Sequence, residues 1–180
     1  MNQAAALTRF GHLARLRAFG RHAGSDQLIQ AGLDALLAGI DSPSLPELAG
    51  LLRSEEPEAP ELFERVLDEL GLTFRAPAEP RAAAWAFALW TAEQMVDGSL
   101  DAASGAYLIR AEIADDLGRP EELDALIHCS VALDSWEESW GEGGAVEVLE
   151  AEAVEAARAL LRSRGTDGEQ APAPEPGPGT

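Results

Sequence analysis

Residues 82–92 read AAAWAFALWTA, the longest apolar run of the chain without a charged residue. Its large side chains, among them Trp85, Phe87 and Trp90, point around most of the circumference of a helix, with small alanines between them. A helix that is apolar on nearly all sides is usually central and buried. The run is too short to span a bilayer, so we expect a core helix over about 81–97.

The composition favours helices elsewhere in the chain as well. Hydrophobic residues make up 46% of the sequence, mostly Ala and Leu, and runs of β-branched residues are missing. Apolar residues recur at helical spacing, as at Ala106, Ile109, Ile113 and Leu117. The sequence therefore predicts an all-α fold, a single bundle-like domain of about six to seven helices with flexible termini.

The charge pattern and composition divide the chain into three parts. Residues 1–24 form a basic N-terminal arm, either mobile or loosely docked, or else docked onto the acidic body or an anionic surface. Residues 25–164 form the acidic helical domain. Residues 165–180 are rich in Pro and Gly and lack large apolar side chains, which predicts a disordered tail.

The segment GIDSPSLPE at 39–47 raises the question whether it is a binding loop or a corner between two helices. Gly39 suits the end of one helix. Ser44 and Glu47 have the spacing of a capping box at the start of the next helix, with Pro46 in its first turn. We expect a helix corner. The preceding helix shows one apolar face, formed by Ile29, Leu33, Leu36 and Ile40.

Two stretches resemble a known pattern: LDALLAGIDSPSLPELAGL at 33–51, and the region from Trp90 to Glu138 that includes DDLGRPEELDALIHCSVALDSWEE. They resemble small helical proteins of actinobacteria that share a G-[IL]-D-S-P-x-L-x-E-L-A-G-L segment. The resemblance covers about 33–163 and implies an all-α domain. It implies no activity and no site residues.

The formal net charge of −19 restricts the possible partners. A body this acidic repels nucleic-acid phosphate and anionic lipid, so we expect neither nucleic-acid nor membrane binding. It attracts basic proteins. The single cysteine, Cys129, excludes an internal disulfide, and no signal-peptide pattern is present, so we expect a reducing, cytoplasmic compartment.

No arrangement of residues predicts a catalytic, cofactor or metal site. His128 and Cys129 are adjacent, so they project about 100° apart on a helix and do not face each other. Glu112, Asp115 and Asp116 share one helix face, a spacing that hard cations accept, but solvated surface charge is the favoured interpretation. We predict no cofactor and no metal, and the pattern leans against an enzyme.

The stretch DSWEESWGEGG at 134–144 is the strongest candidate for a binding site. Trp136 and Trp140 lie one helical turn apart, flanked by Asp134, Glu137 and Glu138. One interpretation makes both tryptophans core residues that dock the helix end. The other makes them an aromatic and acidic patch for a partner, because Trp is enriched among interface hot spots.

Three classes of function remain open. The leading hypothesis is a non-enzymatic protein that binds a basic protein partner, in the manner of an immunity protein, an antitoxin or a regulator. The second is a bundle that binds or transforms a small ligand in a pocket near Trp85–Met95. The third is an accessory subunit that assembles with itself.

Overall fold

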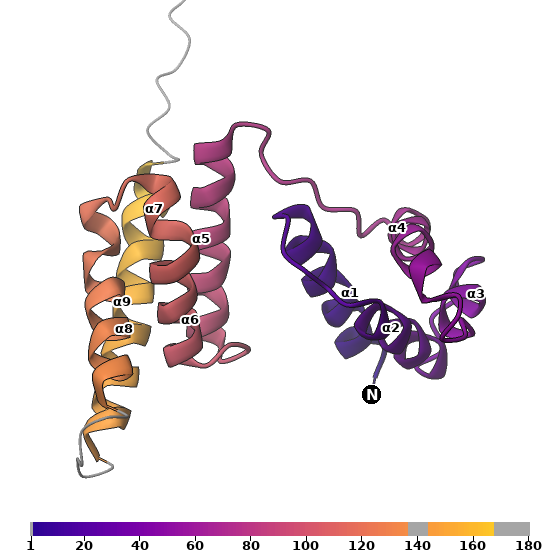
Figure 1. The fold of residues 1–180 in the computed structure, drawn as a ribbon, viewed down its shortest axis with the longest axis horizontal. Coiled ribbons are helices and arrows are strands. Elements are labelled where there is room, and N and C mark those ends of the chain that lie inside the picture. The colour runs from indigo at the N-terminus through magenta and orange to yellow at the C-terminus, as the bar shows by residue number, and fades with distance from the viewer. Residues whose placement is uncertain (1, 137–143, 168–180) are drawn as a thin grey trace, which may run out of the picture. The chain divides into compact units, whose positions relative to one another are not determined.

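The protein is described from a computed structural model that covers the backbone of residues 2–136 and 144–167, and the side chains of 2–135 and 146–164 (Figure 1). Helices, turns and loops make up these residues, and no strand occurs among them. This confirms the all-α, bundle-like class. None of the described helices combines the length and the apolarity that a bilayer crossing requires.

The chain contacts itself within two compact units, Met1–Pro77 and Ala78–Thr180. The sequence predicted one domain over 25–164, preceded by an arm. The boundary instead lies at Pro77, in the FRAPAEP segment, and residues 1–24 belong to the first unit. Each unit is therefore described by itself.

Unit 1 consists of four α-helices and one short 3-10 helix within its described residues (Figure 1). Each α-helix after the first follows a turn that contains glycine or proline. The elements are α1 (Gln3–Ala18), α2 (Ser25–Leu37), α3 (Leu45–Ala49), η1 (Glu56–Glu58) and α4 (Ala59–Leu70).

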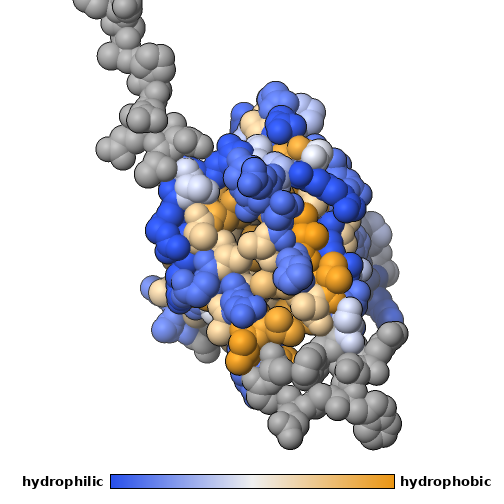
Figure 2. Space-filling view, turned by 90° about the vertical axis from the view of Figure 1, so that its left-hand side faces the viewer, coloured by the Kyte–Doolittle hydropathy of each residue, from blue (hydrophilic) through white to orange (hydrophobic). Residues whose placement is uncertain are grey.

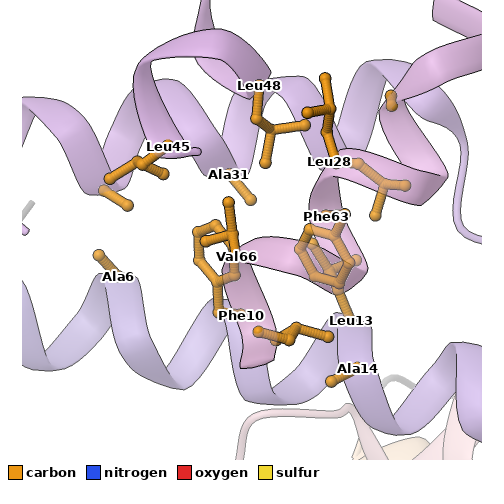
Figure 3. Packing of buried hydrophobic residues seen from close by; sticks show 14 of the residues in the cluster. Ala6, Phe10, Leu13, Ala14, Leu28, Ala31, Leu45, Leu48, Phe63 and Val66 are labelled. Atoms are coloured by element: carbon orange, nitrogen blue, oxygen red, sulfur yellow. The ribbon is translucent and has the colours of Figure 1, made fainter. Parts of the chain in front are cut away.

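Helix α1 is part of the core of unit 1, which corrects the prediction of a mobile or loosely docked arm. Phe10 is 0% exposed and stacks on Phe63 of α4, with ring centroids 5.0 Å apart (Figure 3). Arg9 donates to Asp34 at 2.6 Å and Arg17 to Glu64 at 3.1 Å. The arginines thus dock α1 onto acidic side chains of α2 and α4, and the buried apolar face of α1 supplies the packing: Ala6, Phe10, Leu13 and Ala14.

The corner at 39–47 is fixed to the end of α4 by hydrogen bonds. Gly39 has a φ of +76°, the left-handed conformation that ends α2 cheaply. The hydroxyls of Ser42 and Ser44 and the backbone N–H of Ser44 all donate to the carboxylate of Glu69. The predicted capping box is wrong, because the Ser44 side chain makes no cap hydrogen bond in α3 and is engaged by Glu69 instead.

Helix α2 confirms only part of the apolar face that its sequence predicts, because Ile40 is buried and Ile29 packs against the core, while the two leucines of that face do not. Leu28, Ala31, Gly32 and Ala35 are buried, whereas Leu33 and Leu36 are exposed. The small residues allow α3 to approach closely: a Cβ built on Gly32 would lie 2.9 Å from Cγ of Leu48. This close packing decides which side of α2 faces inward.

Unit 2 is a helical bundle within the residues that are described, and its α6 and α9 each contact both α5 and α8 (Figure 1). Helix α5 contacts α6, the π-helix η2, α7 and α9, and its Trp85, Phe87 and Trp90 are buried, as the sequence predicts. The elements are α5 (Pro80–Asp97), α6 (Ala102–Leu108), η2 (Ile109–Ile113), α7 (Ala114–Leu117), η3 (Glu121–Leu123), α8 (Asp124–Trp136) and α9 (Gly144–Asp167).

Helices α6 and α7 are joined by η2, a π-helical turn. The N–H of Ala114 bonds to the carbonyl of Ile109, five residues earlier. In a straight α-helix Ile109 and Leu117 would project about 80° apart. The π turn contains more residues per turn, which reduces this angle and brings the two side chains closer to one face. The predicted stripe is confirmed, since Ala106, Ile109, Ile113 and Leu117 are all buried.

The ends of the unit 2 helices are fixed by polar contacts. Asp101 accepts the N–H of Ser104 at the start of α6, and that bond holds the pKa of the Asp101 carboxyl below its usual value. Arg164, near the end of α9, stacks over the ring of Trp85 and pairs with Glu122 at 3.2 Å. The predicted tail begins within the last turn of α9, and its residues 168–180 lie outside the described part of the chain.

Candidate functional site

The predicted aromatic and acidic patch lies largely outside the described residues. Trp140, Glu137 and Glu138 fall in the segment 137–143, and Trp136 is described as a backbone position alone, at the end of α8. Asp134 is described. Its carboxylate pairs with Arg110 at 3.1 Å on the surface of unit 2. The structure therefore brings Asp134 to a site that the sequence did not predict.

That site is a groove between the α6–η2 segment and α8, with a volume of about 480 Å³. We call it the Tyr107 groove, after the single tyrosine of the chain, which lies exposed on its wall. Helix α6 and η2 supply one wall, and α8 supplies the other. The residues that line it are Leu100, Ala103, Ser104, Tyr107, Leu108, Glu112, Ser130, Leu133 and Asp134.

A guanidinium group lies beside this groove, next to an aromatic ring and a carboxylate. The Cζ atom of Arg110 is 5.5 Å from the ring centroid of Tyr107, a cation–π distance. The same side chain donates to Asp134 at 3.1 Å and so joins η2 to α8. Tyr107 and Arg110 are three residues apart, a spacing that places side chains on one side of a helix.

Ser130 is the buried polar group of the groove. The residue is 3% exposed, and its Oγ has no hydrogen-bond partner within the described part of the chain. A buried hydroxyl without a partner destabilises the fold by about 1–3 kcal/mol. Such a group is uncommon in a well-packed core and calls for an explanation, such as strain, an ordered water or a bound polar atom.

The acidic residues around η2 do not form a metal site in the described structure. Asp115 is bonded to Arg119 at 2.7 Å, and Glu112 lies on the groove wall. Among the residues that are described, no cluster of three His, Cys, Asp or Glu side chains has a metal-binding arrangement.

Cys129 is a buried thiol on α8. Burial raises the pKa of its thiol, and the negative charge of Glu152 raises it further. The thiolate is the reactive form of cysteine, so both effects suppress its reactivity near neutral pH. Its neighbour His128 is exposed, whereas Cys129 is buried, which places the two side chains on different sides of α8.

The predicted pocket near Trp85–Met95 is not where the groove lies. Trp85, Trp90 and Met95 are buried in the core of unit 2, and none of the residues 85–95 lines the Tyr107 groove. Helix α6 lies between the groove and α5. It packs closely on α5, since a Cβ on Gly105 of α6 would collide with Met95 of α5. Helix α5 thus packs against one wall of the groove but contributes no residue to its lining.

The negative charge of the protein is concentrated in unit 2. Residues 78–180 contain 6 Arg and 21 Asp or Glu, a formal charge of −15, whereas residues 1–77 contain 7 Arg and 11 acids, a charge of −4. On the side of unit 2 where α8 lies, hydrophobic residues cover the middle of the face and hydrophilic residues surround them (Figure 2). Six arginines cannot neutralise the charge of 21 carboxylates, so unit 2 keeps a large net negative charge.

Sequence reasoning missed Tyr107, Arg110 and Ser130. A signal existed for each: Tyr107 and Arg110 have cation–π spacing on a helix, and Ser130 interrupts the apolar stripe of Leu126, Cys129 and Leu133. No sequence pattern indicated that these residues lie close together, because Tyr107 and Ser130 belong to separate helices.

Comparisons with known proteins do not assign this site. No protein-family profile, no curated protein and no solved structure matches the chain. The resemblance to small helical actinobacterial proteins stays a prediction.

Proposed function

We propose that this protein binds a basic protein partner and that unit 2 carries the binding surface. The observation that supports the proposal is the division of charge, −15 in unit 2 against −4 in unit 1. An excess of unpaired surface carboxylates on one unit raises the rate of encounter with basic proteins and repels nucleic acid.

The arginines of unit 2 leave this surface negative. Arg119, just after the end of α7, pairs with Asp115 of that helix, and Arg158 pairs with Glu155 on α9. Arg81 donates to the carbonyl of Leu117. These contacts involve only two of the unit's carboxylates and leave most of its negative charge in place. The aromatic and acidic patch of Trp136 and Trp140 belongs to the same unit by sequence, and we propose it as the apolar part of the partner surface.

The first test is capture of partners from the native cell at low salt, followed by elution with a salt gradient. We expect basic proteins that elute as ionic strength rises, because screening weakens contacts between exposed charges. The recovered partner then serves in a binding assay with purified variants. Partners that are acidic, or complexes that do not respond to salt, would contradict the proposal.

Matched charge variants locate the surface. The pair Glu147→Gln and Glu152→Gln removes two charges from unit 2, and Glu56→Gln with Glu58→Gln removes two from unit 1. We expect the unit 2 pair to weaken the complex about threefold at low salt and the unit 1 pair to leave it unchanged. Equal effects of the two pairs would place the partner elsewhere.

Self-association is the second candidate function, and exposed leucines on α2 favour it. Leu36 is 40% exposed and Leu37 is 78% exposed, next to Leu33 on the same helix. Adjacent exposed leucines are typical of interaction surfaces. Light scattering across a range of protein concentrations tests this candidate: a higher mass that disappears in Leu36→Ser with Leu37→Ser supports it, and a monomer at every concentration rejects it.

A further inference from the structure

The Tyr107 groove has the dimensions of a small-molecule site. Its volume of about 480 Å³ lies within the range that ligand sites occupy. Leucine side chains from both walls, Leu100, Leu108 and Leu133, offer an apolar lining. A small number of polar groups interrupt it, which is the usual composition of a site that binds an apolar body and orients it through one polar group.

The charge of the lining selects a cation. Glu112 and Asp134 contribute carboxylates, and none of the described residues that line the groove is an arginine or a histidine. Unit 2 as a whole, these two residues included, carries a net charge of −15. A carboxylate ligand would meet repulsion here, whereas an amine or a guanidine would be attracted.

The protein's own Arg110 shows the geometry that such a cation needs. Its guanidinium lies over the ring of Tyr107 at 5.5 Å and pairs with Asp134 at 3.1 Å. Aromatic faces and carboxylates together recognise organic cations. Arg110 belongs to η2, and π-helical turns occur frequently at functional sites. A ligand cation would share or compete for the same two groups.

Ser130 supplies an independent observation. It lines the groove, it is 3% exposed, and its Oγ has no hydrogen-bond partner among the described residues. A hydroxyl accepts as well as donates, so the N–H of a bound amine would satisfy it. Among the described residues that line the groove, no other polar side chain is both buried and without a hydrogen-bond partner.

We propose that the Tyr107 groove binds a small organic cation, an amine or guanidine carried on an apolar body. The apolar body packs against the leucines, and the cation binds at Tyr107 and Asp134, within reach of Ser130. This site takes a small molecule and does not depend on the protein partner proposed above.

The test uses the full chain labelled with ¹⁵N, titrated with phenethylamine as the cation and hydrocinnamate as the anion of matching shape. We expect phenethylamine to shift the amide signals of α6, η2 and α8, and to bind about tenfold more tightly than hydrocinnamate. The signals of unit 1 serve as an internal control. Equal binding of the two probes, or no shifts up to about 10 mM, would overturn the proposal.

Two substitutions with opposite expected signs distinguish a binding role from a structural one. Asp134→Asn removes the carboxylate and should weaken phenethylamine about fivefold, whereas Asp124→Asn, on the same helix outside the groove, should not. Arg110→Met keeps an apolar stem, removes the competing cation and should strengthen binding. Weaker binding to Arg110→Met would count against the site, as would equal losses in the two aspartate variants.

Ser130→Ala tests whether the Ser130 hydroxyl contributes to ligand binding or to the stability of the fold. We expect phenethylamine to bind about threefold more weakly while the melting temperature stays the same or rises, because the substitution removes a buried group without a partner. Unchanged binding by this variant would remove Ser130 from the site. Loss of melting temperature together with binding would show that the hydroxyl has a structural role.

Discussion

Glu69, one residue before the end of α4, accepts two hydrogen bonds from Ser44, one from the backbone N–H at 2.9 Å and one from the hydroxyl at 2.6 Å. These residues are separated by 25 positions in the chain. The contact gives the two serines of the GIDSPSLPE segment, Ser42 and Ser44, a structural role. These serines hold the corner between α2 and α3 against α4, which makes the segment a structural joint of unit 1.

The carboxylate of Glu69 should make unit 1 sensitive to acid. Its pKa lies below the usual value because the Ser42 hydroxyl donates to it, with further bonds from Ser44. A carboxyl whose folded pKa is depressed stabilises the fold above its unfolded pKa, and the contribution is lost as pH falls through the folded pKa. We expect Glu69→Gln to lower the melting temperature at neutral pH.

The difference between Glu69→Gln and the natural protein should shrink as pH falls from the ordinary glutamate pKa through the lower folded pKa, because the unfolded chain takes up the proton first and the folded carboxylate is protonated only at lower pH. Thermal melts at a series of pH values measure this. In a Ser42→Ala background the effect of Glu69→Gln should be smaller, since one donor has gone. A pH-independent difference would mean that the hydrogen bonds do not depend on the ionised form.

Phe10 should be among the most important residues for the stability of unit 1. It is fully buried and stacks on Phe63, with an angle of 12° between the rings. Phe10→Ala should destabilise unit 1 by about 3–5 kcal/mol. Leu7→Ala is the control, because Leu7 lies on the same helix and is 36% exposed. Similar losses in the two variants, measured by urea denaturation, would show that α1 is not packed as described.

Two glycines in helices should respond oppositely to alanine. Gly11 in α1 has open space where a Cβ would lie, so Gly11→Ala should stabilise by about 0.5–1 kcal/mol. Gly32 in α2 would place a Cβ 2.9 Å from Cγ of Leu48. Repacking around the added methyl group costs about 1–3 kcal/mol, which exceeds the gain in helix propensity from glycine to alanine. Gly32→Ala should therefore destabilise unit 1. Stabilisation by both substitutions would mean that α3 packs less closely on α2.

Cys129 should react slowly with thiol reagents in the native protein. Burial raises the pKa of the thiol, so less thiolate is present at a given pH than in an unfolded chain. Alkylation followed by mass spectrometry should show rapid modification in denaturant and slow modification without it. Rapid native modification at neutral pH would contradict a buried thiol of raised pKa.

Much of unit 2 could be predicted from its sequence because its apolar pattern leaves few alternatives. The run around Trp85 and Trp90 is apolar on nearly every side, so burial was the only stable outcome for it. The stripe from Ala106 to Leu117 was identified correctly, although the π turn that carries it has no sequence signal. The cap at Asp101 depends on local chemistry alone, because aspartate is a preferred N-cap residue.

Unit 1 shows where such prediction fails. The leucines of α2 are spread over about half of its circumference, so the sequence allowed several faces to be buried. The close approach of Leu48 to Gly32 selected the face with the small residues. The same holds for α1: its four buried residues form a stripe, but the partner that covers it, Phe63, lies more than 50 residues later.

The sequence by itself determined the helical class, the core of α5, the helix ends at glycines and the acidity of residues 78–180. These depend on local propensity and on composition, which act within one or two turns of the chain. The tertiary structure decided the face of α2, the docking of α1, the partner of Ser44 and the meeting of Tyr107, Asp134 and Ser130. Each of these joins residues of different helices, and local pattern carries no information about which helices pack together.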